Sequence, residues 1–205
     1  MPAPATLLLF AASTLVLLAV PGPSVLYVVA RTVEQGRAAG LVSVLGLETG
    51  ALLHVVAAAA GLSALIASSP AAFAVLRYAG GAYLLWLAVR ALRRRATEAA
   101  GRLDPASHAR LFRDGVLVDV LNPKTALFFL AFLPGFVHDG AGPVAVQVAV
   151  LGLVFVVLAA LTDGAYAVAA ARVSGGARRG ATSRRRLACA SAGAYGLLGV
   201  LALAG

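Results

Sequence analysis

Six apolar stretches follow one another along the chain, separated by short polar connections. Each is long enough to cross a hydrocarbon layer of about 30 Å as an α-helix. The pattern therefore predicts an all-α membrane protein with one membrane domain over residues 1–205. The predicted spans cover approximately residues 5–30, 38–67, 71–92, 112–137, 143–171 and 187–204.

Prolines interrupt two of these stretches, the first and the fourth. Proline lacks an N–H and clashes with the preceding helical turn, so each interruption frees backbone groups that need other partners. One such kink can simply shape a bundle, but two at corresponding places suggest a shared role. We expect both spans to be pairs of half-helices whose breaks face each other. The residues of the breaks are Pro21, Gly22, Pro23, Ser24, Asn122, Pro123 and Lys124.

Short matches relate the first three predicted spans to the last three. They occur in the same order in both halves, and an odd number of spans per half makes the halves enter the membrane from opposite sides. The sequence thus predicts two inverted-topology three-helix repeats, each with a broken first helix. The repeats cover about residues 5–92 and 112–204, and a cytoplasmic linker of about residues 93–111 joins them. The matches pair Pro23 with Pro123, residues 44–47 with 150–153, and residues 81–85 with 193–197.

Composition and charge agree with this class. The chain is 61% hydrophobic and only 12% charged, whereas a soluble domain has about 25% charged residues. Its net charge of +9 does not indicate nucleic-acid binding, because 15 of the 17 basic residues lie in connections one to two, three to four and five to six. By the positive-inside rule these connections are cytoplasmic, so both termini are predicted outside. The single cysteine, Cys189, excludes an internal disulfide and a cysteine-based metal site.

Three ionisable residues are predicted at a similar depth inside the membrane. Lys124, the only lysine, lies 11 residues after Arg113, Glu48 lies 11 after Arg37, and Asp163 lies 9 before Arg172. At the helical rise these separations correspond to roughly 13–16 Å, near the middle of the bilayer. A charge there costs about 3 kcal/mol on the lenient insertion scale and marks a functional site by default. Two repeat tyrosines fall in the same layer, and a third follows Asp163 on its helical face: Tyr83, Tyr195 and Tyr166.

Several roles stay open for these polar residues. Lys124 either forms a structural ion pair with Asp163 or Glu48, or takes part in a binding site. Glu48 lies between Gly46 and Gly50, a small-xxx-small pattern that also indicates close helix packing. His54 is either a hydrogen-bonded interior histidine or a proton relay. Asp119 lies 6 residues after the nearest arginine, or about 9 Å, and is expected to be shallower than the others.

The two breaks, the glycine-spaced second span and the run Gly-Gly-Ala-Tyr-Leu-Leu-Trp-Leu at residues 80–87 resemble the LysE/RhtB family of amino-acid exporters. The resemblance covers nearly the whole chain. It implies export of amino acids or close derivatives across the plasma (inner) membrane, driven in most members by the proton motive force. The lysine after Asn-Pro fits the RhtB-like pattern but does not identify a substrate. A homodimer is one alternative for the oligomeric state.

An amino acid carries a carboxylate and an ammonium. These match a half-helix N-terminus or Lys124 on one side and Asp163 or Glu48 on the other. The predicted partners are therefore an amino-acid-like substrate, protons and the lipid bilayer, and no cofactor or metal is expected. The predicted proton-coupling residues are Asp163 and Glu48. The predicted substrate-binding residues are Pro21, Gly22, Pro23, Ser24, Asn122, Pro123, Lys124, Tyr83, Tyr195 and Tyr166.

Other classes find less support in the sequence. A membrane-embedded aspartyl enzyme could use Asp119 and Asp163, but their predicted depths differ, and no His-Glu-x-x-His, Gly-x-Ser-Gly or Gly-x-Gly-Asp motif is present. No catalytic residue is therefore predicted. A channel should show a continuous polar stripe, whereas polarity here is concentrated in one layer. Export of a different small solute stays an alternative.

Overall fold

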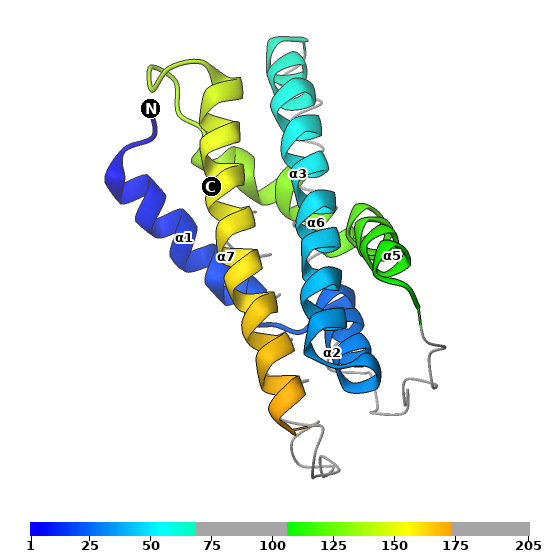
Figure 1. Ribbon diagram of the computed structural model, residues 1–205. Helices are drawn as coiled ribbons and strands as arrows, with labels where there is room; N and C mark the ends of the chain where they lie inside the picture. Colours follow the sequence, from blue (N-terminus) through cyan, green and yellow to red (C-terminus); the bar gives the residue numbers. More distant parts are fainter. Residues whose placement is uncertain (69–105, 174–205) are drawn as a thin grey trace, which may run out of the picture.

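The computed structural model describes residues 1–68 and 106–173, and every regular element in these ranges is helical (Figure 1). The expected all-α class is confirmed to that extent. Predicted spans three and six lie outside the described residues, together with Tyr83 and Tyr195, so the complete six-helix inverted repeat stays a prediction. The α-helices are α1 (Pro4–Leu18), α2 (Pro23–Gln35), α3 (Arg37–Ser68), α5 (His108–Val120), α6 (Pro123–Leu127) and α7 (Val144–Val173). A π-helix, η1 (Phe128–Phe132), and a 3₁₀-helix, η2 (Leu133–Phe136), follow α6.

Two described helices are long and apolar enough to cross a membrane alone. They are α3, over Arg37–Gly61, and α7, over Val144–Arg172. Two further spans are possible as bent pairs. Helices α1 and α2 meet at 56°, and α5 meets the segment Pro123–Phe136 at 44°. The described part of the chain thus contains two clear spans, or four if each bent pair is one span.

Both bends lie where the prolines predict them. Helix α2 begins with Pro23 in its first turn and Gly22 as the N-cap, and no side chain caps this end. Helix α6 also begins with a proline, Pro123, but its N-cap Asn122 accepts a hydrogen bond from Lys124 N at 3.0 Å. Proline is tolerated in a first helical turn because its missing N–H has no partner there. The proline of each break therefore interrupts the span and also starts its second half-helix.

Helix α3 packs against α5 at a distance that only glycine allows. A Cβ atom added to Gly46 would lie 2.2 Å from Phe112 O, and one added to Gly115 would lie 2.7 Å from Ser43 O. Four residues along α3, a Cβ on Gly50 would lie 2.8 Å from Asp119 Cβ. The small-xxx-small pattern of the second predicted span is therefore a helix contact. This contact sets the position of Glu48, which lies between the two α3 glycines.

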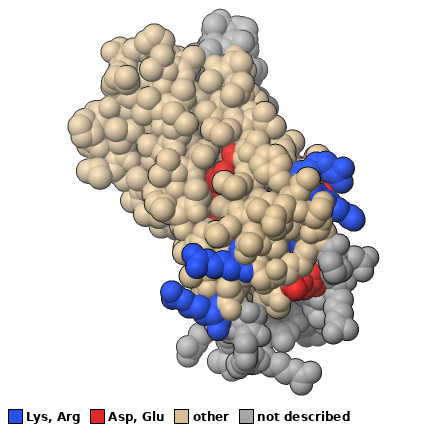
Figure 2. Space-filling model, viewed as in Figure 1, with Lys and Arg blue, Asp and Glu red and all other residues tan. Residues whose placement is uncertain are grey.

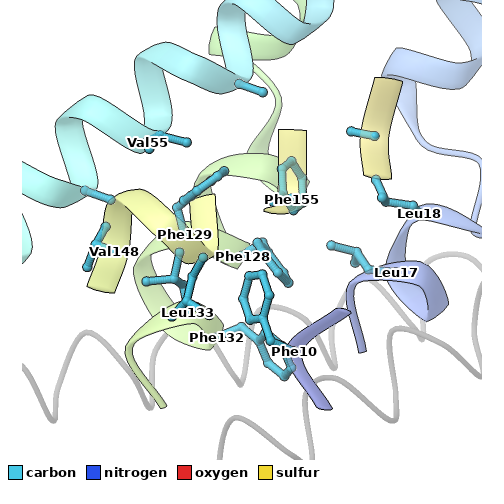
Figure 3. Packing of buried hydrophobic residues seen from close by; sticks show 14 of the residues in the cluster. Phe10, Leu17, Leu18, Val55, Phe128, Phe129, Phe132, Leu133, Val148 and Phe155 are labelled. Atoms are coloured by element: carbon cyan, nitrogen blue, oxygen red, sulfur yellow. The ribbon is translucent and has the colours of Figure 1, made fainter. Parts of the chain in front are cut away.

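The larger buried apolar cluster among the described residues contains five phenylalanines, and we call it the aromatic cluster (Figure 3). The ring centroid of Phe128 lies 4.8 Å from that of Phe155 on α7 and 5.7 Å from that of Phe10 on α1. Phe129 and Phe132 of the π-helix also face this cluster. Such contacts stabilise beyond the apolar area they bury. The cluster connects the first half-helix of one span to the second half-helix of the other.

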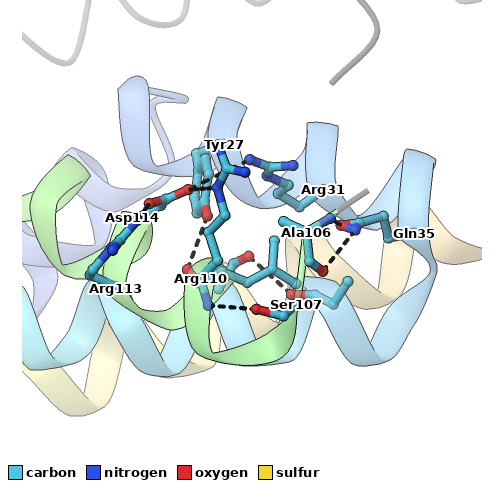
Figure 4. Close-up of polar contacts among 11 residues, drawn as sticks. Tyr27, Arg31, Gln35, Ala106, Ser107, Arg110, Arg113 and Asp114 are labelled. Carbon is cyan, nitrogen blue, oxygen red and sulfur yellow. Dashed lines mark hydrogen bonds and ion pairs between the residues drawn. The ribbon is translucent and has the colours of Figure 1, made fainter. Parts of the chain in front are cut away.

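The arginine side chains of the described part gather toward one end of the molecule (Figure 2). There α2 and α5 are joined by polar contacts (Figure 4). The Tyr27 hydroxyl donates to Leu111 O at 3.0 Å, Arg31 Nη2 lies 3.8 Å from Asp114 Oδ2, and the Gln35 amide exchanges two hydrogen bonds with the Ala106 backbone. These contacts hold the second half of the first span against the first half of the fourth.

At the opposite end, the chain start contacts the connection between η2 and α7. The Met1 ammonium donates to Ala141 O, and buried Gln147 holds the same connection through His138 and Gly142. The N-terminus and predicted connection four to five therefore lie at the same end, away from the arginines. This arrangement agrees with the predicted topology, although it does not say which end is outside.

Candidate functional site

A cavity lies where the two broken spans meet, and helices α1, α2, α3, α5, α6 and α7 all contribute to it. The volume of the cavity is about 30 Å³. Several predicted site residues line it, including Gly22 of the first break. Its polar side chains are those of Ser24, Glu48, Asp119, Asn122, Lys124, Thr125 and Asp163.

The two breaks contact each other directly. Asn122 Nδ2 of the second break donates to Ser24 Oγ of the first at 2.9 Å. Ser24 Oγ in turn donates to Asp119 Oδ1 at 3.2 Å. The expectation that the breaks face each other is confirmed, and a short chain of hydrogen bonds joins them.

Lys124 is buried, with 7% of its surface exposed, and its Nζ donates to Val20 O at 2.7 Å. Val20 lies two residues after the end of α1, where the helix dipole is negative and favours a cation. Glu48 and Asp163 line the same cavity as Lys124. The two alternatives drawn from the sequence, a structural ion pair and a place in a binding site, both stay predictions. Through Val20 O, Lys124 links the second break to the backbone of the first.

The carbonyl groups freed by the breaks find side-chain partners on neighbouring helices. The Tyr166 hydroxyl of α7 donates to Ala19 O at 3.0 Å, next to the carbonyl that Lys124 binds. His54 Nε2 of α3 lies 3.1 Å from Asp119 O at the end of α5, and its ring stacks on Phe129. A carbonyl oxygen only accepts, so Nε2 carries the proton of this hydrogen bond. These are the contacts of a hydrogen-bonded interior histidine.

Asp119 lies deeper than the sequence suggested. It is 5% exposed, it lines the cavity together with Asp163, and its Oδ1 also accepts from Thr125 Oγ1 at 2.9 Å. The expected depth was counted from Arg113, the second of two arginines in α5. Counted from Arg110, an arginine nearer the start of the helix, Asp119 is nine residues deep, as Asp163 is from Arg172.

Thr125 was missed as a site residue. Its hydroxyl is buried and bonds Asp119 across the second break. The signal in the sequence is its place directly after Lys124, within the first turn of a helix that starts in the membrane. Of the predicted residues, Tyr166 lies at the first break without lining the cavity, and Pro21, Pro23 and Pro123 shape the breaks.

Comparison with known proteins decides the class. The family described as LysE type translocator matches residues 15–204. The chain belongs to the LysE family. The homoserine/homoserine lactone efflux protein of Salmonella typhimurium (strain LT2) is 31% identical over 160 residues, 75% of each chain. The leucine efflux protein of Enterobacter sp. (strain 638) is 32% identical over 60% of this chain and 59% of its own. An uncharacterized membrane protein of Vibrio cholerae is 32% identical over 75% of each chain. No solved structure matches.

Membership in the LysE family also settles the enzyme alternative. Because Asp119 and Asp163 line one cavity, the depth argument against a catalytic aspartyl pair no longer holds. The family consists of translocators, so this LysE member is a multi-pass membrane transporter and not an enzyme. Within the described ranges, no group of three or more histidine, cysteine or acidic side chains could hold a metal ion.

Proposed function

We propose that this LysE family protein exports amino acids or close derivatives from the cytoplasm by proton-coupled alternating access around the cavity between the two breaks. The observation that carries the proposal is a cavity with acids and a lysine at the junction of two broken helices. In transporters with inverted repeats, such junctions form the substrate and ion sites. The printed names of two relatives, a homoserine/homoserine lactone efflux protein and a leucine efflux protein, support an amino-acid substrate.

The cavity offers partners for both charged groups of an amino acid. The first turn of α2 has no side-chain cap, and its residues Ser24 and Val25 line the cavity. Their N–H groups, at the positive end of the helix dipole, suit a carboxylate. Lys124 adds a positive charge nearby, and the acids Asp163 and Glu48 suit an ammonium or a proton. In this proposal Asp163 and Glu48 carry the coupling protons.

The size of the cavity supports an alternating mechanism. A cavity needs about 10–15 Å³ to hold one water molecule. The volume of about 30 Å³ therefore has room for about two waters and is too small for an amino acid. The α2–α5 contacts lie toward the arginine-bearing end, and Phe155 of the aromatic cluster borders the cavity. We expect loading and release of a substrate to open the contacts on one side of the cavity at a time.

The direct test is efflux from whole cells. Cells with and without the protein are preloaded with labelled homoserine, homoserine lactone, leucine or another candidate, one at a time, and loss of label is followed. We expect faster loss of at least one amino acid or derivative when the protein is present. Equal rates for every candidate, with the protein verified in the membrane, would count against amino-acid export and favour a different solute.

The proposed topology places the arginine-bearing connections in the cytoplasm and both termini outside, in the plasma membrane. In a variant without Cys189, an impermeant thiol reagent should label Asp139→Cys in intact cells and His108→Cys only after permeabilisation. Both positions are exposed and lie at opposite ends of the described part. Labelling of His108→Cys in intact cells, with Asp139→Cys protected, would reverse the orientation.

A further inference from the structure

Two buried carboxylate oxygens in the cavity have no hydrogen-bond partner among the described residues. Glu48 is 8% exposed and Asp119 is 5% exposed, and no residue of the described ranges forms a hydrogen bond with Glu48 Oε2 or Asp119 Oδ2. Buried polar atoms are nearly always hydrogen-bonded, and leaving one unpaired is costly. Both side chains line the same cavity. The unpaired oxygens therefore point to a ligand that none of the described residues supplies.

The two acids are held in place from different helices. Glu48 is on α3 between Gly46 and Gly50, and Asp119 is on α5, where a Cβ on Gly50 would lie 2.8 Å from Asp119 Cβ. Ser24 and Thr125 both donate to Asp119 Oδ1, which fixes this carboxylate and leaves Oδ2 to accept from another group. Close helix packing and the hydrogen bonds at the break thus bring two acceptor oxygens of like charge to one cavity.

The chemistry of the pair selects its ligand. Two carboxylates near each other repel when both are ionised, so a neutral amide or hydroxyl would satisfy hydrogen bonds but not the charge. A primary ammonium has a positive charge and three N–H donors, and its hydrogen bonds to carboxylates are charge-assisted. A metal ion is less suited, because the described residues contain no group of three or more possible ligands of the acidic, histidine or cysteine type.

We propose that Glu48 and Asp119 together bind the ammonium group of the transported amino acid. This inference rests on the proposed function and changes its assignment of residues, since Glu48 moves from proton coupling to substrate binding and Asp119 joins it there. Asp163, on α7 across the cavity, is left to interact with Lys124. A pair of carboxylates predicts a substrate with a free primary ammonium. In this proposal the carboxylate of the substrate is bound by the N-terminus of α2 and Lys124.

The test uses the full chain in liposomes and whichever of labelled homoserine and labelled leucine the parent protein exports. The substrate concentration at half-maximal efflux is measured for the parent, Asp119→Asn and Glu48→Gln. Asparagine keeps an oxygen for Ser24 and Thr125 and removes only the charge, so the hydrogen bonds at the break survive. We expect each variant to raise this concentration by about tenfold or more, the range for a lost charge-assisted hydrogen bond. Asp139→Asn, the same change at an exposed residue outside the cavity, should match the parent.

A second readout separates binding from structure. The unlabelled α-hydroxy acid, in which a hydroxyl replaces the ammonium, is compared with the unlabelled amino acid as a competitor. The parent should strongly prefer the amino acid, and the two variants should lose most of this preference. A structural role would change the rate or the amount of protein and leave the preference unchanged. If one variant is not produced, the competitor preference of the other variant still tests the ammonium site.

The outcomes distinguish the two proposals. Absence of efflux by the parent for both labelled amino acids would contradict the proposed function itself. Efflux by the parent, with both variants keeping its half-maximal concentration and its preference, would overturn only the ammonium site. Loss of the preference in Asp163→Asn alone would likewise overturn it and return the ammonium to Asp163.

Discussion

Replacing Lys124 by arginine, or Asp163 by asparagine, should lower efflux by about tenfold or more while protein abundance stays near normal. Arginine keeps the charge and can still donate to Val20 O, but its planar guanidinium differs in shape and does not release a proton. Asparagine keeps the size of Asp163 and removes its titrating group. Both changes therefore act on transport rather than on insertion.

The mild substitutions matter because harsher ones are ambiguous. Truncation of Lys124 or Asp163 to alanine removes the charge together with the volume and the hydrogen-bonding groups, which costs several kcal/mol in a buried cavity and can prevent folding. Arg113→Lys, a conservative change at an exposed position of the arginine-bearing end, serves as the control and should export at the parent rate. If Lys124→Arg and Asp163→Asn are made at normal levels and export with the parent rate and pH dependence, these residues are scaffold.

The second large effect is on stability: Gly46→Ala should destabilise the folded protein, while Gly61→Ala should not. The new Cβ at position 46 would lie 2.2 Å from the carbonyl oxygen of Phe112, so α3 and α5 must separate. Overpacking of this kind costs about 1–3 kcal/mol or more, which exceeds the roughly 1 kcal/mol that alanine gains over glycine in a helix. At Gly61, no atom of the described residues lies within 4 Å of the added Cβ.

Thermal unfolding and membrane abundance of the two variants measure this difference. We expect Gly46→Ala to unfold at a lower temperature than the parent and to accumulate less, and Gly61→Ala to equal or slightly exceed the parent. Because Glu48 follows Gly46 by two residues, efflux per folded molecule should fall as well in Gly46→Ala. Parent-like stability in Gly46→Ala would show that α3 and α5 do not approach each other this closely.

The breaks were predictable because their causes are local. Proline disrupts a helix wherever it occurs, and its repetition at Pro23 and Pro123 pointed to a common site. The shared depth of Glu48, Lys124 and Asp163 was also predictable, since helical rise converts a residue count into a distance. These three residues do line one cavity.

The partners within the cavity were not predictable, because they depend on how helices pack. Residue counts gave Lys124 a depth but could not show that its Nζ donates to the carbonyl of Val20. Asp119 was placed too shallow because the count started from Arg113 instead of Arg110, which lies nearer the start of α5. The π-helix that directs Phe128 and Phe129 into the core has no simple sequence signal.

The central claim is that this chain alone moves amino acids through the cavity between its two breaks. Purified protein in liposomes preloaded with labelled homoserine or leucine tests it most directly, beside liposomes that contain Lys124→Arg and liposomes without protein. The account predicts loss of label from the parent liposomes at least about tenfold faster than from the other two. Equal retention of both labels in all three preparations would contradict it, as would equally fast loss from the parent and Lys124→Arg liposomes.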